Sequence, residues 1–503
     1  MQIDYTGHPF VDVGIAAITA FAEKQHPSEV TADDLAKLAA YIREHYVRPP
    51  LRGHLTMAFT SNAWFSQDAY NPYKPDLSAE EQTKRTQSLN AWANRHLQQW
   101  QEPEHHPDDE TCIFTGLPAV AEALSGSLKP GRAARSQIPM LQSDGSMNFF
   151  TEGIPGLPIS GQALLALQFF PLACAKCGVG LLAVHADQPE LTYAFALDFW
   201  RQNQQHILQA QQAEETKMPG AHRSPRTLLI ETLLKIEERR KQEEEPVSLS
   251  AYNFNNGKSP SLVIYHLPLE TIDFLQHAGS GPYRDAWQRL VQENWERPPK
   301  SKSTGKRSAK QETTFEPRRN YLYEDVFELP HNAASFLRTY FVRIPRRTHA
   351  TTDPEWGYTL RGRWGSGSWS LLELFLRKVI RMEQARIEQI RTLGDGLAVY
   401  VRQQGRKKFF RSFFNERSPW KFRGLLIRAN VNHVKAGNPP LFTMDHYIDI
   451  FEEAEEMMRP DWQLARDLVM MRMIEQLQDW LQQDPDILPF ADTEENEDAE
   501  PSS

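Results

Sequence analysis

Apolar side chains recur every three or four residues over much of the chain, which predicts amphipathic helices. In the N-terminal part this pattern covers 15–24 and 33–46. Thr31 precedes the second segment and is predicted to cap it. Ser78 and Glu81 have capping-box spacing and predict a further helix over 79–100.

The C-terminal part shows the same helical spacing almost without interruption from Trp369 onward. It predicts a helical bundle over 371–485, built from segments at 371–390, 409–414, 422–434, 444–458 and 461–481. Residues 247–268 instead read as two strands around an Asn256–Gly257 turn. Together with the cysteine motifs described below, the two patterns predict the α+β class, with a mixed N-terminal domain that contains a zinc-knuckle-like module and a C-terminal helical bundle.

Changes in composition divide the chain further. We expect an N-terminal α+β domain that contains a cysteine-bearing module, a basic flexible linker, a connecting segment, the helical bundle and an acidic disordered tail. Their predicted bounds are 1–299, with the module at about 105–185, then 300–320, 321–370, 371–485 and 486–503.

The composition indicates a globular protein. Of 503 residues, 40% are hydrophobic and 24% charged, so the chain can bury sizeable cores. No apolar run reaches the length of a membrane span, and the first residues lack the basic and apolar regions of a secretory signal. Three cysteines in so long a chain do not make a disulfide framework, so a reducing cytoplasm is the expected location.

The net charge of −9 is unevenly spread along the chain. Residues 335–435 hold 21 Lys/Arg against 7 Asp/Glu, whereas 436–503 hold 3 against 18. Aromatic residues interrupt the basic stretch, and cations with aromatic rings suit phosphates and unpaired bases. The alternative is a solvated helix face above a phenylalanine core. The candidate DNA contacts in this stretch are Arg406, Lys407, Lys408, Arg411, Lys421 and Arg423.

Motifs for catalysis are scarce. The NNGKS segment imitates a phosphate loop, but Tyr252 stands where the first glycine is required. No HExxH helix or GxSxG elbow occurs. A site assembled from distant residues stays open, but we expect the chain not to be an enzyme.

The three cysteines lie in two similar short motifs. Cys174 and Cys177 form a C-x-x-C-G pattern, and Cys112 begins a C-x-x-T-G pattern in which Thr115 replaces the second cysteine. This spacing is compatible with a zinc site in which Cys112, Cys174 and Cys177 are ligands. His105, His106 or His185 would supply the fourth ligand. The alternative is that all three are small buried thiols.

Several segments together resemble a known family. The opening TGHPFVDVG, the two cysteine motifs, the hairpin at 252–267 and the SWSLLELFL helix start are similar to the CXXC–CXXC family, the large subunits of type I-B CRISPR Cascade complexes. The resemblance spans most of the chain and departs from the family at Thr115. It implies a non-enzymatic subunit of an antiviral ribonucleoprotein complex, with guide RNA, other Cascade subunits and a helicase-nuclease as partners.

The resemblance also implies a division of labour. Guide pairing reads the target sequence, so the protein needs a reader for the short PAM duplex and a channel for single strands in the R-loop. The loop at 60–74 offers Asn62, Gln67, Asn71 and Lys74 as candidate readers, and GRWGSGSW offers Arg363. The alternatives are a buried aromatic loop whose amides satisfy the backbone and a flexible start to the following helix.

Two further hypotheses follow. A different function would be a free-standing metal-dependent nuclease or nucleic-acid-modifying enzyme. Met382, expected inside a helix, is also a candidate start for a small subunit translated from within the same gene, for which the resemblance supplies a precedent. The alternative is an ordinary helical methionine.

Overall fold

The computed structural model describes residues 3–60, 63–100, 110–126, 128–141, 154–239, 245–257, 259–297, 315–341, 365–404, 407–454 and 457–483. The predicted linker falls mostly outside these ranges and the acidic tail entirely so. Mixed helices and small antiparallel sheets confirm the α+β class.

The chain forms two compact units. Unit 1 comprises Met1–Leu269 and Glu296–Arg319, and unit 2 comprises Glu270–Trp295 and Asn320–Ser503. Residues 270–295, which the sequence analysis assigned to the N-terminal domain, therefore belong to the unit that contains the helical bundle.

Unit 1 is mainly helical. Its longer helices are α1 (Pro9–Phe21), α2 (Ala32–His45), α3 (Leu51–Leu55), α4 (Ala79–Leu97), α5 (Gly161–Phe169), α6 (Pro189–Gln212) and α7 (Pro225–Arg239). Both predicted N-terminal caps are confirmed. Thr31 and Asp34 exchange side-chain and backbone hydrogen bonds at the start of α2, and Ser78 and Glu81 do the same for α4. Capping boxes of this kind provide hydrogen-bond partners for backbone amides that the first turn of a helix leaves unpaired.

A four-stranded antiparallel sheet runs through unit 1 in the order β3–β4–β5–β6. The strands are β3 (Ala175–Cys177), β4 (Gly180–Ala186), β5 (Leu249–Asn255) and β6 (Ser261–Leu267). The predicted hairpin around Asn256–Gly257 is confirmed by the β5–β6 pairing. A separate two-residue pair joins β1 (Arg132–Ala133) to β2 (Leu157–Pro158).

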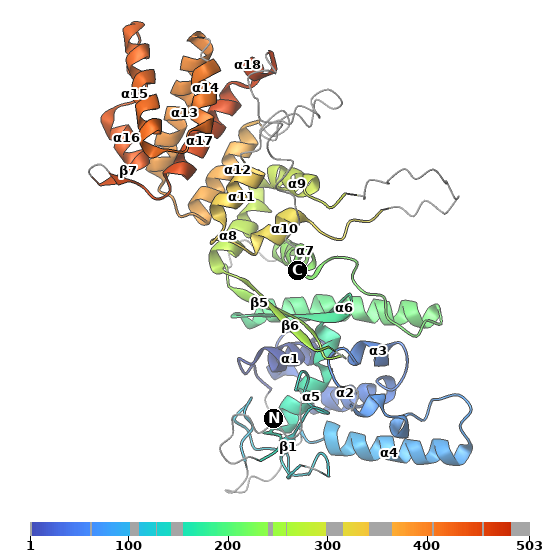
Figure 1. The fold of residues 1–503 in the computed structure, drawn as a ribbon. Coiled ribbons are helices and arrows are strands. Elements are labelled where there is room, and N and C mark those ends of the chain that lie inside the picture. Colours follow the sequence, from blue (N-terminus) through green and yellow to red (C-terminus); the bar gives the residue numbers. More distant parts are fainter. Residues whose placement is uncertain are drawn as a thin grey trace, which may run out of the picture. The chain divides into compact units, whose positions relative to one another are not determined.

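The core of unit 1 lies where α1 packs against α5, α6 and β4 (Figure 1). Gly14 makes the α1–α5 packing close, since a Cβ there would meet the Ala166 carbonyl oxygen at 2.2 Å. Phe10, Phe170 and Phe254 stack across the junction of α1 with the sheet, with ring centroids 4.7–5.5 Å apart. Aromatic burial of this kind supplies much of a core's stability.

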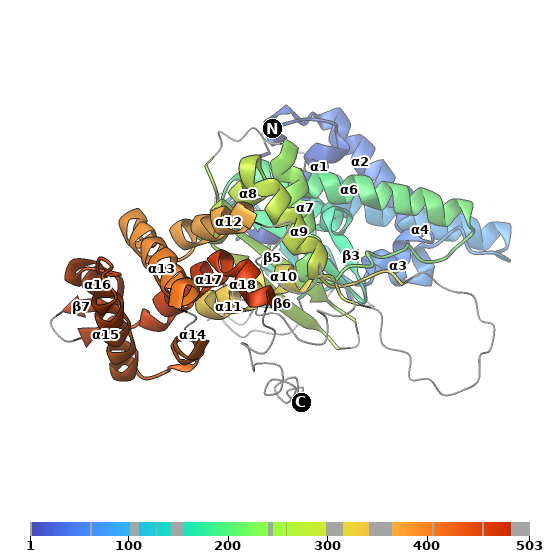
Figure 2. The same cartoon turned by 90° about the horizontal axis from the view of Figure 1, so that it is seen from above.

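Unit 2 is built from helices, shown in both views (Figures 1 and 2). They are α8 (Leu269–Ala278, all but its first residue in this unit), α9 (Arg284–Glu293), α10 (Tyr321–Val326), α11 (Ala333–Tyr340), α12 (Gly365–Lys378), α13 (Gln384–Gln404), α14 (Lys407–Asn415), α15 (Pro419–Lys435), α16 (Met444–Phe451), α17 (Trp462–Gln476) and α18 (Gln478–Gln483). α13 packs along α17 and α16, while α14 contacts α15 and α17. Phe413, Phe422, Phe451 and Trp462 form the aromatic centre of this packing.

Two predicted helices differ from the structure. The segment at 371–390 is not one helix, because α12 ends at Lys378 and α13 begins at Gln384, so Met382 lies between them rather than inside a helix. Arg381 in this break has a φ of +58° and pairs with Glu270. The segment at 444–458 is helical only to Phe451; the chain then forms β7 (Glu452–Ala454), which pairs with β8 (Met457–Met458). Within the described ranges, no helix combines the length and apolarity that a bilayer crossing requires.

Candidate nucleic-acid interface

Helices α14 and α15 carry the densest positive charge of unit 2. Residues 407–435 contain eight Lys/Arg and one Asp/Glu. On α14, Lys407 and Lys408 are exposed, while Phe409, Phe410 and Phe413 are buried. The RKKFFRSFF segment is therefore amphipathic, and its aromatic rings serve the core while its lysines face solvent.

The other predicted phosphate contacts differ in how they are held. Lys421 is exposed, and Arg411 is half-buried. Arg423 pairs with the Glu452 carboxylate and donates to the Tyr447 hydroxyl at 3.1 Å. The hydrogen bond to Tyr447 raises the pKa of Arg423. Arg406 lies outside the described residues.

The structure adds two exposed cations to this surface, Arg417 just before α15 and Arg428 within it. We define the basic face as the exposed side chains Lys407, Lys408, Arg417, Lys421 and Arg428. Their common charge can neutralise phosphates without reading sequence.

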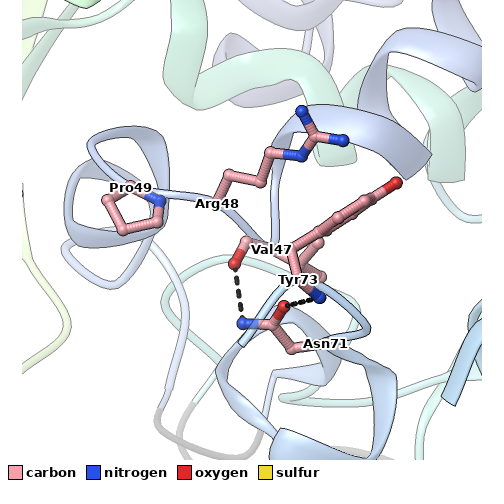
Figure 3. A pocket seen from close by; sticks show the side chains of 5 residues that line it. All are labelled: Val47, Arg48, Pro49, Asn71 and Tyr73. Carbon is pink, nitrogen blue, oxygen red and sulfur yellow. Dashed lines mark hydrogen bonds between the residues drawn. The ribbon is translucent and has the colours of Figure 1, made fainter. Parts of the chain in front are cut away.

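A pocket of about 360 Å³ opens in unit 1 between the end of α2 and the loop before α4, lined by Val47, Arg48, Pro49, Asn71 and Tyr73 (Figure 3). Arg48 lies over the Tyr73 ring, with its guanidinium carbon 3.7 Å from the ring centroid. Its Nη2 is 3.5 Å from the Glu44 carboxylate. Its buried Nε has no hydrogen-bond partner among the groups that the structure describes. Stacking on Tyr73 keeps the guanidinium plane at the edge of the pocket.

Asn71 lines this pocket and is buried. Its side-chain nitrogen donates to the Val47 carbonyl at 3.1 Å, and its side-chain oxygen accepts from the Tyr73 amide at 3.0 Å (Figure 3). Both ends of the amide are thus engaged by the backbone. This geometry favours the structural alternative for Asn71 over base reading.

The remaining predicted readers are spread over this loop. Gln67 is exposed. Lys74 is partly exposed and pairs with Asp68 at 2.6 Å. Asn62 and Arg363 lie outside the described residues. Sequence reasoning missed Arg48, whose only local signal is its position between α2 and two prolines.

Cys112 occupies a tight turn. Its amide donates to Leu117 O and its carbonyl accepts from Gly116, which has a φ of +69°. The amide of Phe114 donates to the Cys112 sulfur at 3.4 Å, and the Thr115 hydroxyl bonds to that of Ser160 at 2.9 Å. The Thr115 side chain is therefore engaged by Ser160.

Cys174 and Cys177 lie at β3 and are both buried. The Cys174 thiol donates to Phe170 O at 3.3 Å. Burial raises the pKa of Cys174, and it raises that of Cys177 to about 12. A raised pKa favours the protonated thiol, whereas zinc binds cysteine as the thiolate. The buried surroundings of both cysteines therefore favour the form that zinc does not bind.

No three His, Cys, Asp or Glu side chains gather into a metal-binding group in the part of the chain that the structure describes, which leaves out His105 and His106. His185 points its Nε2 to Asp12 at 3.1 Å. Asp12 also accepts from Thr6 and Gly7 and is buried, so His185 is engaged in an internal network. The described residues therefore fit buried thiols better than a closed zinc site.

Comparison of the chain with protein-family models, with curated proteins and with solved structures finds no match.

Proposed function

We propose that the chain is a DNA-binding large subunit of a type I-B CRISPR RNA-guided surveillance complex. In this role it recognises the PAM in duplex DNA, helps to open the duplex, stabilises the R-loop and helps to recruit the helicase-nuclease. The observation that carries the proposal is the basic face of α14 and α15, two helices in contact that each expose cations and bury aromatic side chains. Such a surface suits the backbone of a displaced or paired strand.

Each unit has a different part in the proposal. Base pairing with the guide reads the target, so the basic face needs only to hold phosphates. The pocket beside Arg48 and Tyr73 is the candidate for duplex contact, because a planar guanidinium can donate two hydrogen bonds to a guanine edge. Neither role requires bond cleavage by this chain.

Zinc has no part in this proposal. The sequence predicts zinc on Cys112, Cys174 and Cys177, and this stays a prediction. If zinc binds there, it would hold the two cysteine turns together.

Charge reversal tests the role of the basic face. The variant Lys407→Glu/Lys408→Glu is expected to bind target DNA more weakly while keeping its PAM preference, because phosphate contacts carry no sequence information. If the parent contacts about six phosphates, its affinity falls roughly 10³-fold between about 50 and 200 mM salt. The variant should show a salt slope smaller by about two. Lys84→Glu/Lys129→Glu, with two exposed lysines of unit 1, is the charge-matched control.

A flat salt response of the parent, or an equal loss in the control, would contradict the proposal. Purification with and without the expected partners separates the alternative function. The proposal predicts co-purification with guide RNA and other subunits. DNA cleavage by the isolated chain with magnesium or manganese would instead support the nuclease alternative.

A further inference from the structure

Trp420 is the most exposed aromatic side chain of the α14–α15 region. It lies in the first turn of α15 and is 65% exposed. The phenylalanines of the two helices are buried, except for the half-buried Phe414; the buried ones are Phe409, Phe410, Phe413 and Phe422. A base could therefore reach the indole ring but not these phenyl rings.

The Trp420 ring is held from one side. The guanidinium carbon of Arg423 lies over it, 5.0 Å from the ring centroid. Arg423 is itself fixed by the Glu452 carboxylate and the Tyr447 hydroxyl. A cation over one face of an indole leaves the other available for stacking, and its fixed position lowers the entropy lost on binding.

Exposed cations lie on both sides of Trp420 in the chain. Arg417 precedes it, Lys421 follows it directly, and Arg428 lies two helical turns further along α15. Lys421 and Arg428 are seven residues apart, or about 10 Å along the helix axis. A strand whose phosphates contact these side chains would bring its bases close to the indole.

We propose that Trp420 is a stacking platform for an unpaired base of a single-stranded nucleic acid, with Arg423 behind the ring and Lys421 on the neighbouring phosphate. This inference rests on the proposed function and adds to it a base contact that is independent of sequence. Aromatic stacking is tolerant of base identity because every base has a π-face.

The same helix also offers a different use. Ile427, Val431 and Val434 are exposed and follow Trp420 at helical spacing. An apolar stripe of this kind could contact a protein partner. The cations on either side of Trp420 favour the nucleic acid, and the experiment distinguishes the two.

The experiment uses the full chain and two single strands of about 20 nucleotides, oligothymidine and an abasic strand with the same number of phosphates. Trp420→Ala is expected to weaken oligothymidine binding by roughly 5- to 150-fold, the range for loss of one stacked base. On the abasic strand the variant should match the parent within about twofold, since only phosphates remain to be bound. Trp420→Phe should keep most of the affinity.

Three further variants serve as comparisons. Lys421→Ala should weaken binding to both strands equally. Tyr321→Ala removes another exposed aromatic ring of unit 2 and should leave the affinity for both strands unchanged. Ile427→Ser should also bind both strands as the parent does.

Equal binding of oligothymidine by the parent and by Trp420→Ala would overturn the inference. Loss of a protein partner in both Trp420→Ala and Ile427→Ser, with strand binding unchanged, would assign the stripe to protein docking and would also overturn it. If instead the proposed function itself is wrong, the parent chain should bind both strands weakly and without salt dependence.

Discussion

The guanidinium of Arg48 stacks on the ring of Tyr73, with 3.7 Å between its central carbon and the ring centroid. The pair lines the pocket that also contains Asn71 (Figure 3). Stacking fixes the plane of the guanidinium, and a fixed plane favours paired hydrogen bonds to a guanine edge. Among the described residues of this loop region, Arg48 is therefore the strongest candidate for base contact.

Arg48→Ala is expected to reduce discrimination among PAM variants by about 1–3 kcal/mol, the usual value of a bidentate base contact. Arg48→Lys should lose nearly as much, because an ammonium keeps the charge but not the planar fork. Binding to duplexes that differ only in the flanking bases measures the effect. Arg43→Ala, an exposed arginine of α2, is the control. An equal loss on all duplexes would show a phosphate contact instead.

Asn71→Ala is expected to lower the free energy of unfolding of unit 1 by about 1–3 kcal/mol, since it leaves the buried Val47 carbonyl and the partly buried Tyr73 amide without partners. Asn71→Asp keeps the acceptor for the Tyr73 amide but loses the donor to Val47 O, so it tests the two bonds separately. Denaturant unfolding followed by tryptophan fluorescence measures both variants. A fully stable Asn71→Ala that loses PAM discrimination would restore Asn71 as a base reader.

Local signals predicted the parts of the fold that depend on neighbouring residues. The caps at Thr31 and Ser78 and the β5–β6 hairpin each rest on groups a few residues apart. The break before α13 could not be predicted in this way. Arg381 there pairs with Glu270, more than a hundred residues away, while the apolar spacing continues across the break.

Local sequence signals also predicted only part of the candidate interface. Its charge was evident from composition, but sequence could not tell the exposed Trp420 from the buried Phe422 two residues later. That difference depends on which side of α15 packs against the bundle. Similarly, the hydrogen bond from Asn71 to Val47 O joins residues 24 apart and has no local pattern, whereas the bond that Asn71 accepts from the Tyr73 amide two residues later is the local contact of an Asx turn.

If the three cysteines are buried thiols rather than zinc ligands, the purified protein should hold well below one zinc per chain. Cys174 donates its thiol proton to Phe170 O, and burial raises the pKa of both Cys174 and Cys177. Elemental analysis of protein purified without chelator measures the metal. About one zinc per chain that disappears in Cys112→Ala would support the zinc prediction and contradict the buried-thiol interpretation. Ile113→Ala, at an exposed neighbour, is the control.

Unit 1 is expected to lose stability as the pH falls below neutrality. His54 is buried, its Nε2 lies 2.7 Å from Pro171 O, and burial lowers its pKa from 6.5 to about 4. Between these values the unfolded chain binds a proton that the folded chain does not, so acid favours unfolding. The stabilisation that comes from keeping His54 neutral is fully present above about pH 6.5. Through His54 alone, the free energy of unfolding falls by about 1 kcal/mol between pH 7 and 5.5.

Denaturant unfolding at several pH values measures this slope. His54→Gln should reduce the slope whatever its effect on absolute stability, because one of the proton uptakes is removed. Part of the slope should remain, since burial also lowers the pKa of His96 in unit 1 to about 4. His331→Gln, at an exposed histidine, should leave the slope unchanged. A slope that is the same in the parent and in His54→Gln would contradict the assignment.

Met382 lies in the break between α12 and α13, where its amide donates to Leu376 O at 2.9 Å. A polypeptide that begins at Met382 would therefore start directly before α13 and contain α13 to α18 whole. These helices pack on one another through α13 with α16 and α17, and through α14 with α15 and α17. Their shared aromatic centre lies entirely within residues 382–503. Helical domains of this size can fold alone.

We therefore expect the purified complex to contain, beside the full-length chain, a C-terminal species that starts at or near Met382 and carries the basic face. Intact-mass analysis detects it directly. Met382→Leu should remove this species and weaken R-loop formation, while the full-length chain keeps its fold because leucine fills a similar volume at this buried position. Met444→Leu, at an exposed methionine of α16, should leave the species in place. If only the full-length chain is found, Met382 is an ordinary buried methionine between two helices, and the basic face acts only as part of the whole chain.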